Sequence, residues 1–228
     1  YGRFDAVNGV ARRNLARLTP NGTVDTSWNP SPNASVNHVL VDDAGGIYVA
    51  GGFTEIAGQS AQGRLVRLNA GGSLMAGFNP APNFSVSRMV LEGTTLYVSG
   101  FFSQISGTAR QGLTKIDATT GAIDSSFLQT TPVLTPSRFE RLGSALWISD
   151  STIRATASTI DTLGARRVDA TTAATLPVTD VTRPPRVLAL ARQPDGATLV
   201  GGFFARIGGA QRNLIRITPD GQFDSTFA

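Results

Sequence analysis

The sequence predicts an all-β protein of the β-propeller class, and three observations support this. One pattern of residues recurs along the chain, each copy reads as short strands joined by tight turns, and the composition favours turns over helices. The 228 residues include 25 glycines and 12 prolines, and charged residues make up only 16%, against roughly 25% in an average domain. A chain of this length can bury a sizeable core without disulfides.

The repeat is marked by three series of residues that share one period of about 50. The first series has a glycine, any residue and a phenylalanine, with its phenylalanines at Phe4, Phe53, Phe102 and Phe204. The second is an aliphatic strand with one cation, at Arg17, Arg67, Lys115 and Arg216. The third is a closing aromatic residue, at Trp28, Phe78, Phe127 and Phe227.

The last copy shows the expected strands most clearly, at 187–191, 198–204, 214–218 and 222–227. Pro-Asp-Gly turns at 194–196 and 219–221 separate them, and these residues preset the angles of a tight hairpin. Four short antiparallel strands in about 50 residues describe one propeller blade. We therefore predict about four and a half four-stranded blades, and the alternative is a β-solenoid.

The repeat boundaries follow from the closing aromatic residues. We expect a partial repeat at 1–28, complete repeats at 29–78 and 79–127, a divergent repeat at 128–178 and a last one at 179–228. Together they form a single propeller domain or a fragment of one, residues 1–228. Because the first copy lacks its inner strands, we expect the chain to be part of a longer repeat protein.

The copies resemble the Delta-60 repeat family of bacterial β-propeller proteins. The matching residues include Arg13-Asn14-Leu15-Ala16-Arg17-Leu18, Asp25-Thr26-Ser27-Trp28-Asn29-Pro30 and Gly201-Gly202-Phe203-Phe204. Kelch repeats are similar in outline, but the Asp-x-Ser-aromatic-Asn-Pro ending favours the first family. The resemblance implies a bacterial protein that is secreted, periplasmic or on the cell surface, and it implies no particular activity.

A cation and an aspartate recur at matching positions of three copies. The turn between the strand with the cation and the strand with the aspartate has three residues, or four in the third copy. With turns of this length, the hairpin register places the cation opposite the aspartate. The expected structural ion pairs are Arg17–Asp25, Lys115–Asp124 and Arg216–Asp224. The second copy breaks the rule, because Arg67 faces Met75. The functional alternative is a ring of ligand-binding cations.

Residues for catalysis and for metal binding are scarce. The chain has no cysteine and one histidine, His38, so thiol chemistry and a multi-histidine metal site are excluded. His38 lies in an innermost strand, where we expect it to be a structural residue. The three glutamates, Glu55, Glu92 and Glu140, show no pairing suited to a glycosidase. We predict no catalytic residue, no metal and no cofactor.

The positive charge of the chain is dispersed. The net charge is only +4, and the arginines are scattered, whereas a nucleic-acid site would gather them into a patch. No apolar run approaches the roughly 20 residues that a membrane span needs. We therefore expect neither a nucleic-acid partner nor membrane insertion.

The loops between second and third strands, and those between copies, are predicted to open on one face. Polar side chains on loops held by a rigid scaffold often bind ligands, and the candidates are Asn33, Asn83, Phe84, Arg110, Gln111, Gln211 and Arg212. The alternative is that the Asn-Pro-x-Pro-Asn segments at 29–33 and 79–83 are stiff connectors. The divergent fourth copy either carries a specialised site around Asp150, Arg154 and Arg166 or has simply drifted.

These observations predict a non-catalytic module that binds a protein or a glycan at its long-loop face, or serves as a scaffold within a larger extracellular protein, with self-assembly as a further option. The alternative is a propeller hydrolase or lyase that acts on an extracellular polysaccharide or lactone. Convergence of ionisable residues at the mouth of the central channel would favour the enzyme.

Overall fold

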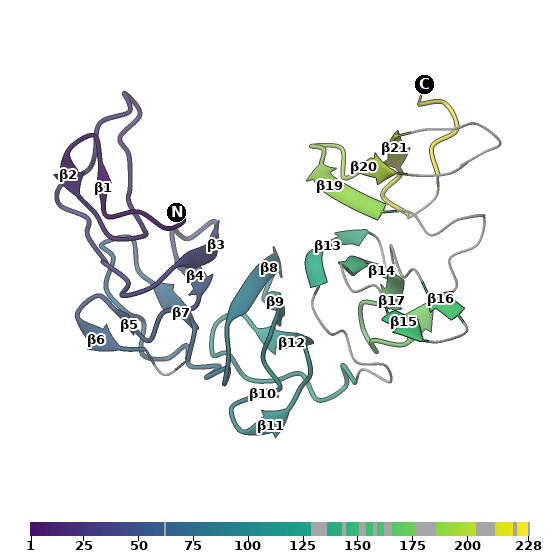
Figure 1. Ribbon diagram of the computed structural model, residues 1–228, viewed down its shortest axis with the longest axis horizontal. Helices are drawn as coiled ribbons and strands as arrows, with labels where there is room; N and C mark the ends of the chain where they lie inside the picture. The colour runs from purple at the N-terminus through teal and green to yellow at the C-terminus, as the bar shows by residue number, and fades with distance from the viewer. Residues whose placement is uncertain are drawn as a thin grey trace. The chain divides into compact units, whose positions relative to one another are not determined.

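The computed structural model describes residues 1–61, 63–128, 136–142, 145–150, 154–156, 159–161, 166–176, 186–203, 213–220 and 223–227. The chain divides into two compact units, 1–124 and 125–228. Every regular element in the described residues is a β-strand (Figure 1), which confirms the all-β prediction. The grouping of all five repeats into one domain stays a prediction.

The first unit contains two antiparallel sheets of three strands each. The sheet of the second repeat has the order β3 (Val36–Val41), β4 (Ile47–Gly51) and β7 (Leu65–Leu68). The third repeat has the same order in β8 (Val86–Glu92), β9 (Thr95–Gly100) and β12 (Leu113–Asp117). The two sheets lie side by side, with β3 and β4 in contact with β8 (Figure 1).

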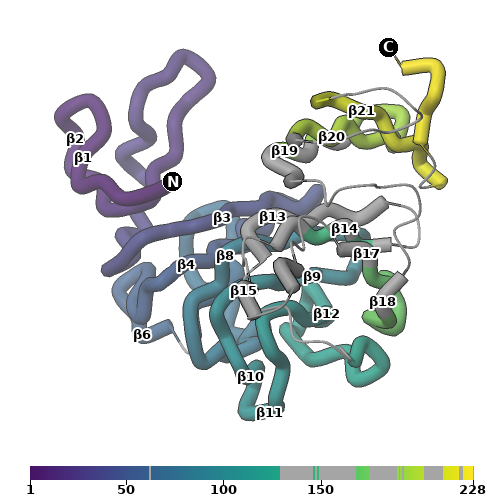
Figure 2. The backbone as a smooth tube through the Cα atoms, turned by 45° about the vertical axis from the view of Figure 1, so that its right-hand side comes forward, coloured from purple at the N-terminus to yellow at the C-terminus, as the bar shows by residue number. Residues whose placement is uncertain are grey.

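A short hairpin fills the loop between the second and third strands of each repeat in this unit. The hairpins are β1 (Ala6–Val7) with β2 (Val10–Ala11), β5 (Glu55–Ile56) with β6 (Gln59–Ser60), and β10 (Gln104–Ile105) with β11 (Thr108–Ala109). Both turn residues have positive φ, for example 46° at Ser106 and 75° at Gly107, as a type I′ turn requires. In Figure 2 the β10–β11 hairpin projects beyond the ends of β9 and β12.

The fourth strand of these repeats is shorter than predicted. It is reduced to one β-bridge on the outer edge, at Leu18–Val24, Leu68–Leu74 and Ile116–Ile123. In the first repeat the reason is a turn at Asp25, whose side chain accepts a hydrogen bond from the Ser27 amide at 3.0 Å. This turn bends the chain inward and buries Trp28, which is 3% exposed.

The second unit repeats this arrangement. One sheet has the order β13 (Pro136–Leu142), β14 (Ala145–Asp150), β17 (Arg166–Asp169) and β18 (Thr175–Leu176), beside a hairpin of β15 (Arg154–Thr156) and β16 (Thr159–Asp161). The other has β19 (Arg186–Arg192), β20 (Thr198–Phe203) and β21 (Leu214–Ile217). The strands predicted at 187–191, 198–204 and 214–218 are thus confirmed.

The repeated aromatic residues of the first unit are packing residues. Phe53 and Phe102 are fully buried, and Phe78 is 5% exposed. Tyr48 packs edge-on against Phe78, and its hydroxyl donates a hydrogen bond to the Ala118 carbonyl of the next repeat at 2.7 Å. A large ring buried at the same place in successive repeats is the main apolar contribution to such a fold.

A buried hydroxyl in the third repeat gives a first testable prediction. Thr114 is fully buried, and its Oγ1 has no hydrogen-bond partner. It pairs with Val98 in the same register in which Val66 pairs with Val49 in the second repeat. A buried hydroxyl without a partner is destabilising, so Thr114→Val should raise the free energy of unfolding by about 1 kcal/mol. Urea denaturation measures the difference.

The matched control is Thr108→Val, at an exposed position of β11. It should leave the free energy of unfolding within about 0.5 kcal/mol of the wild type. If the Thr114 variant were no more stable than the Thr108 variant, the Thr114 hydroxyl would have to be satisfied in solution.

Candidate ligand-binding face

Asn33 fastens the connector that enters the second repeat to the β5–β6 hairpin. Its side-chain oxygen accepts hydrogen bonds from the amides of Thr54 at 2.9 Å and Glu55 at 3.1 Å, and its side-chain nitrogen donates to the Thr54 hydroxyl at 3.0 Å. Both acceptor positions of the amide oxygen are therefore used. Asn33, predicted as a ligand-binding residue, has a structural role here.

Asn83 makes the same set of bonds in the third repeat. Its oxygen accepts from the amides of Ser103 at 3.0 Å and Gln104 at 3.1 Å, and its nitrogen donates to the Ser103 hydroxyl at 2.9 Å. The Pro80 carbonyl of the same connector accepts a bond from the Ser106 amide at 3.0 Å. These contacts support the alternative that the Asn-Pro-x-Pro-Asn segments are stiff connectors, here clamped to the β10–β11 hairpin.

The clamp gives a second prediction. Asn83→Ala removes three side-chain hydrogen bonds that are open to solvent, so the free energy of unfolding should fall by about 1 kcal/mol. The amides of Ser103 and Gln104 should also exchange their hydrogens faster. Gln111→Ala, at an exposed position, is the control and should change neither property. Unchanged exchange in the Asn83 variant would contradict the clamp.

Two exposed aromatic rings lie beside this clamp. Phe84 is 54% exposed, and the guanidinium of Arg64 lies over its ring, 5.2 Å from the ring centre. Arg64 also donates a hydrogen bond to the Asn83 carbonyl at 2.8 Å. Phe101 is 57% exposed, and its amide donates to the Ser85 carbonyl at 2.8 Å. One backbone hydrogen bond therefore links the two segments that carry the rings.

The remaining predicted site residues fall into two groups. Arg110 is partly exposed and donates to the Ala109 carbonyl at 2.8 Å, while its amide bonds the Ser103 carbonyl. Arg110 and Asn83 thus both form hydrogen bonds with Ser103. Gln111, the next residue in the chain, is exposed. Outside the described residues lie Gln211 and Arg212, and the side chains of Asp150, Arg154 and Arg166.

Each expected ion pair forms across the outer hairpin of its repeat. The nitrogen-to-oxygen distances are 2.8 Å for Arg17–Asp25, 2.9 Å for Lys115–Asp124 and 2.5 Å for Arg216–Asp224. Hydrogen bonds from Ser27 and then Arg17 lower the pKa of Asp25, and those from Thr226 and Arg216 lower the pKa of Asp224 to about 2. These aspartates therefore stay ionised at neutral pH and hold the outer hairpins.

The second repeat was expected to lack such a pair, but Arg67 does have a carboxylate partner. Met75 takes the register position opposite Arg67, with its amide 2.8 Å from the Arg67 carbonyl. The partner is Asp42, from the turn after β3, at 2.5 Å. Both side chains are only 14% exposed, and the guanidinium also lies 5.1 Å from the centre of the Tyr48 ring.

His38 joins the inner strands of two repeats. Its Nδ1 accepts a hydrogen bond from the Met89 amide of β8 at 3.3 Å, and Tyr1 packs edge-on against the ring. Burial, and secondarily the charge of Arg88, lowers the pKa of His38 to about 4. Within the parts of the chain that the structure describes, no three histidine, aspartate or glutamate side chains are placed to hold a metal ion.

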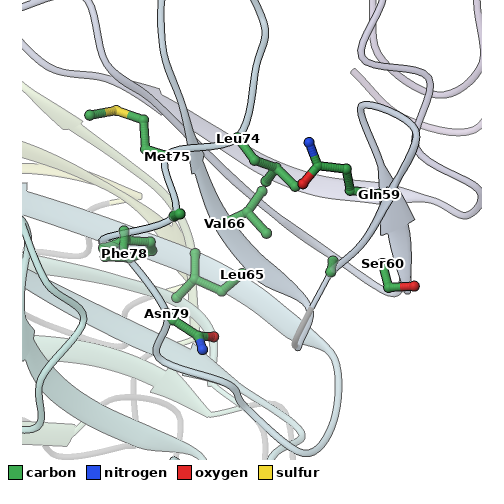
Figure 3. A pocket seen from close by; sticks show the side chains of 10 residues that line it. Gln59, Ser60, Leu65, Val66, Leu74, Met75, Phe78 and Asn79 are labelled. Carbon is green, nitrogen blue, oxygen red and sulfur yellow. The ribbon is translucent and has the colours of Figure 1, made fainter.

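A small pocket opens on the outer edge of the second repeat (Figure 3). Its volume is about 190 Å³, and its walls include the apolar residues Leu65, Val66, Leu74 and Phe78 and the polar residues Gln59 and Asn79. Pockets that enclose organic ligands usually measure roughly 300–1,000 Å³. The pocket is therefore a minor candidate, and the loop face around Phe84 and Phe101 is the better one.

A family model of β-propeller repeats matches parts of the chain. The family model described as "Domain of unknown function (DUF5122) beta-propeller" matches residues 2–27, 45–78 and 193–227, which lie in the first, second and fifth repeats. No curated protein matches the chain. The described residues contain no helix long and apolar enough to cross a membrane.

Two solved structures resemble the chain at low identity. The computationally designed Ika8 protein is 10% identical with a TM-score of 0.50; the alignment covers 80% of this chain and 47% of Ika8. The extracellular domain of BT3049, a two-component system protein from B. thetaiotaomicron, is 11% identical with a TM-score of 0.51; the alignment covers 95% of this chain and 26% of that one. The chain thus spans about half the length of the first and about a quarter of the second.

The repeated antiparallel sheets, the family match and the structural likeness agree. The protein is a β-propeller repeat protein. Its blades are held by buried aromatic residues, outer ion pairs and clamped connectors, and two exposed phenylalanines, Phe84 and Phe101, lie on the loops of the third repeat.

Proposed function

We propose that the protein is a non-catalytic binding module of a bacterial protein exposed outside the cytoplasm, and that it binds through the loop face of its third repeat. The observation that carries this proposal is the pair of exposed rings, Phe84 and Phe101, on loops that Asn83 holds rigidly. Exposed apolar side chains on loops held by a scaffold are typical of binding sites.

Three carboxylates of the first unit support a non-catalytic role. Asp25 accepts hydrogen bonds from Ser27 and Arg17, Asp42 from the Gly46 amide and Arg67, and Asp117 from the amides of Thr120 and Thr119, at 2.7 and 2.9 Å. These contacts favour the ionised form and keep the pKa of each carboxyl low. A general acid at neutral pH needs the opposite, a raised pKa.

A location outside the cytoplasm is supported by the resemblance to Delta-60 repeats and by the described extracellular position of the BT3049 domain. Both suit a module that meets its ligand at the bacterial surface. We also propose that the repeats are Delta-60 repeats, which agrees with the partial match to the DUF5122 propeller model.

The test is to incubate the purified chain with soluble bacterial and plant polysaccharides and to measure, in the same samples, binding of the protein to the polymer and cleavage of the polymer. A binding module should bind a polymer without releasing reducing ends or unsaturated products. Catalytic release of such products, abolished by heating the protein, would contradict the proposal and favour the hydrolase or lyase.

A further inference from the structure

We infer that Phe84, Phe101 and Arg64 form a platform for an acidic polysaccharide, a proposal that rests on the binding role above. The second repeat shows what the same positions look like without such a platform. The connector reads Asn33-Ala34-Ser35 in the second repeat and Asn83-Phe84-Ser85 in the third. Gly52 likewise corresponds to Phe101, because each amide donates to the matching serine carbonyl, Ser35 or Ser85.

The connector of the second repeat forms without either phenylalanine, although the fifth repeat has a phenylalanine pair, Phe203-Phe204, that matches Phe101-Phe102. The second repeat forms the same clamp and the same bonds with alanine and glycine there. Both phenylalanines leave more than half of the side chain in solvent, so they add little to the core. Two exposed rings on hydrogen-bonded segments, at positions where the second repeat has alanine and glycine, therefore indicate a contact surface.

The size of the patch favours a sugar chain over a protein partner. A phenylalanine side chain can bury roughly 150–250 Å², so two half-exposed rings offer on the order of 200 Å². A stable protein interface needs about 800 Å² on each side. The apolar face of one or two pyranose rings, in contrast, matches the area of one or two aromatic rings.

The charge of the patch favours an acidic sugar. Arg64 lies over one face of the Phe84 ring and is fixed by its bond to the Asn83 carbonyl, so its guanidinium is held against the ring. A guanidinium is planar and can bind a carboxylate with two parallel hydrogen bonds. A uronic acid that contacts the exposed part of Phe84 would bring its carboxylate to this group, and the chain's net charge of +4 adds to the attraction.

The experiment uses polygalacturonate and its methyl ester, which carry the same sugar ring with and without the charge. Isothermal titration calorimetry should show the wild-type chain binding the acid form at least tenfold more tightly than the ester. Phe84→Ala and Phe101→Ala should each weaken binding of both polymers at least tenfold. Arg64→Gln should weaken only the acid form and reduce the salt dependence of its binding.

The controls are Leu18→Ala, at an exposed apolar position in the first repeat, and Arg13→Gln, at an exposed arginine. Both should bind like the wild type. The inference is overturned if the wild-type chain binds neither polymer, or if the Phe84 and Phe101 variants bind as tightly as Leu18→Ala. If the Phe84 and Phe101 variants bound a different ligand as tightly as the wild type, the platform would be overturned but the binding role would remain. Cleavage of the polymer would overturn the proposed function itself.

Discussion

Replacing Gly51 by alanine is expected to destabilise the protein by at least about 3 kcal/mol, as severe overpacking does. A Cβ at this position would lie 2.2 Å from the Ser35 backbone oxygen. That oxygen cannot move away, because it accepts the Gly52 amide at 3.0 Å, while the Gly51 amide bonds the Arg64 carbonyl at 3.0 Å. Neither glycine has a positive φ, so the penalty comes from close approach alone.

The neighbouring glycine is the matched control. A Cβ at Gly52 would meet only the Ser35 hydroxyl oxygen, at 3.7 Å, which is ordinary contact. Gly52→Ala should therefore leave stability unchanged or raise it by up to about 1 kcal/mol. Thermal and urea unfolding of the two variants, side by side, measure the difference. Equal stability of the two variants would show that the strand and the connector are not packed as described.

Acidification should weaken the fold through one residue, His38. Its pKa is lowered from an ordinary 6.5 to about 4 in the folded state, so the unfolded chain binds more protons between these values. Stability is then fully present above pH 6.5 and is lost as the pH falls toward 4. Between pH 7 and pH 5 the expected loss is about 2 kcal/mol.

The chain has a single histidine, which makes this prediction easy to isolate. The charged and titratable groups that face it are Arg88 from β8 and Tyr1. His38→Asn offers an oxygen to the Met89 amide in place of Nδ1 but does not titrate. Urea unfolding at pH 7 and pH 5 should show the loss in the wild type and a much flatter response in the variant. A similar loss in both would assign the pH dependence to other groups.

The repeat made most of the fold predictable. A period of about 50 residues with Pro-Asp-Gly turns is a strong local signal, and three strands of the fifth repeat are found within one residue of the prediction. The fourth, predicted at 222–227, is reduced to a bridge between Ile217 and Phe223. The register of the outer hairpins also follows from turn length, which is why Arg17 meets Asp25. Features determined by neighbouring residues in the chain are the ones that a single sequence reveals.

Features that depend on residues far apart in the chain were missed. The partner of Arg67 is Asp42, 25 positions away across two strands, and no local pattern connects them. The hairpins inside the second-to-third loops were missed for a different reason. Their signal is a two-residue turn ending in glycine, such as Asn8-Gly9, but the flanking strands have only two residues each.

The candidate site was predicted in part. Phe84 was predicted because it is an aromatic residue in a polar connector. Phe101 was not predicted, because it is the variable middle residue of the repeated glycine–x–phenylalanine pattern. The exposure of Phe101 and its link to the Ser85 carbonyl come from the folded structure. The contact of Arg64 with Phe84 joins two repeats, and only the packing of their sheets reveals it.

The central claim is that the buried repeated residues build the blades and that Phe84 and Phe101, exposed on the third repeat, bind the ligand. The most direct test is the double variant Phe84→Ala with Phe101→Ala, with unfolding and polygalacturonate binding measured on the same preparation. We predict a free energy of unfolding within about 1 kcal/mol of the wild type and no detectable binding. A large loss of stability with binding unchanged would contradict the claim, because the two rings would then be part of the scaffold.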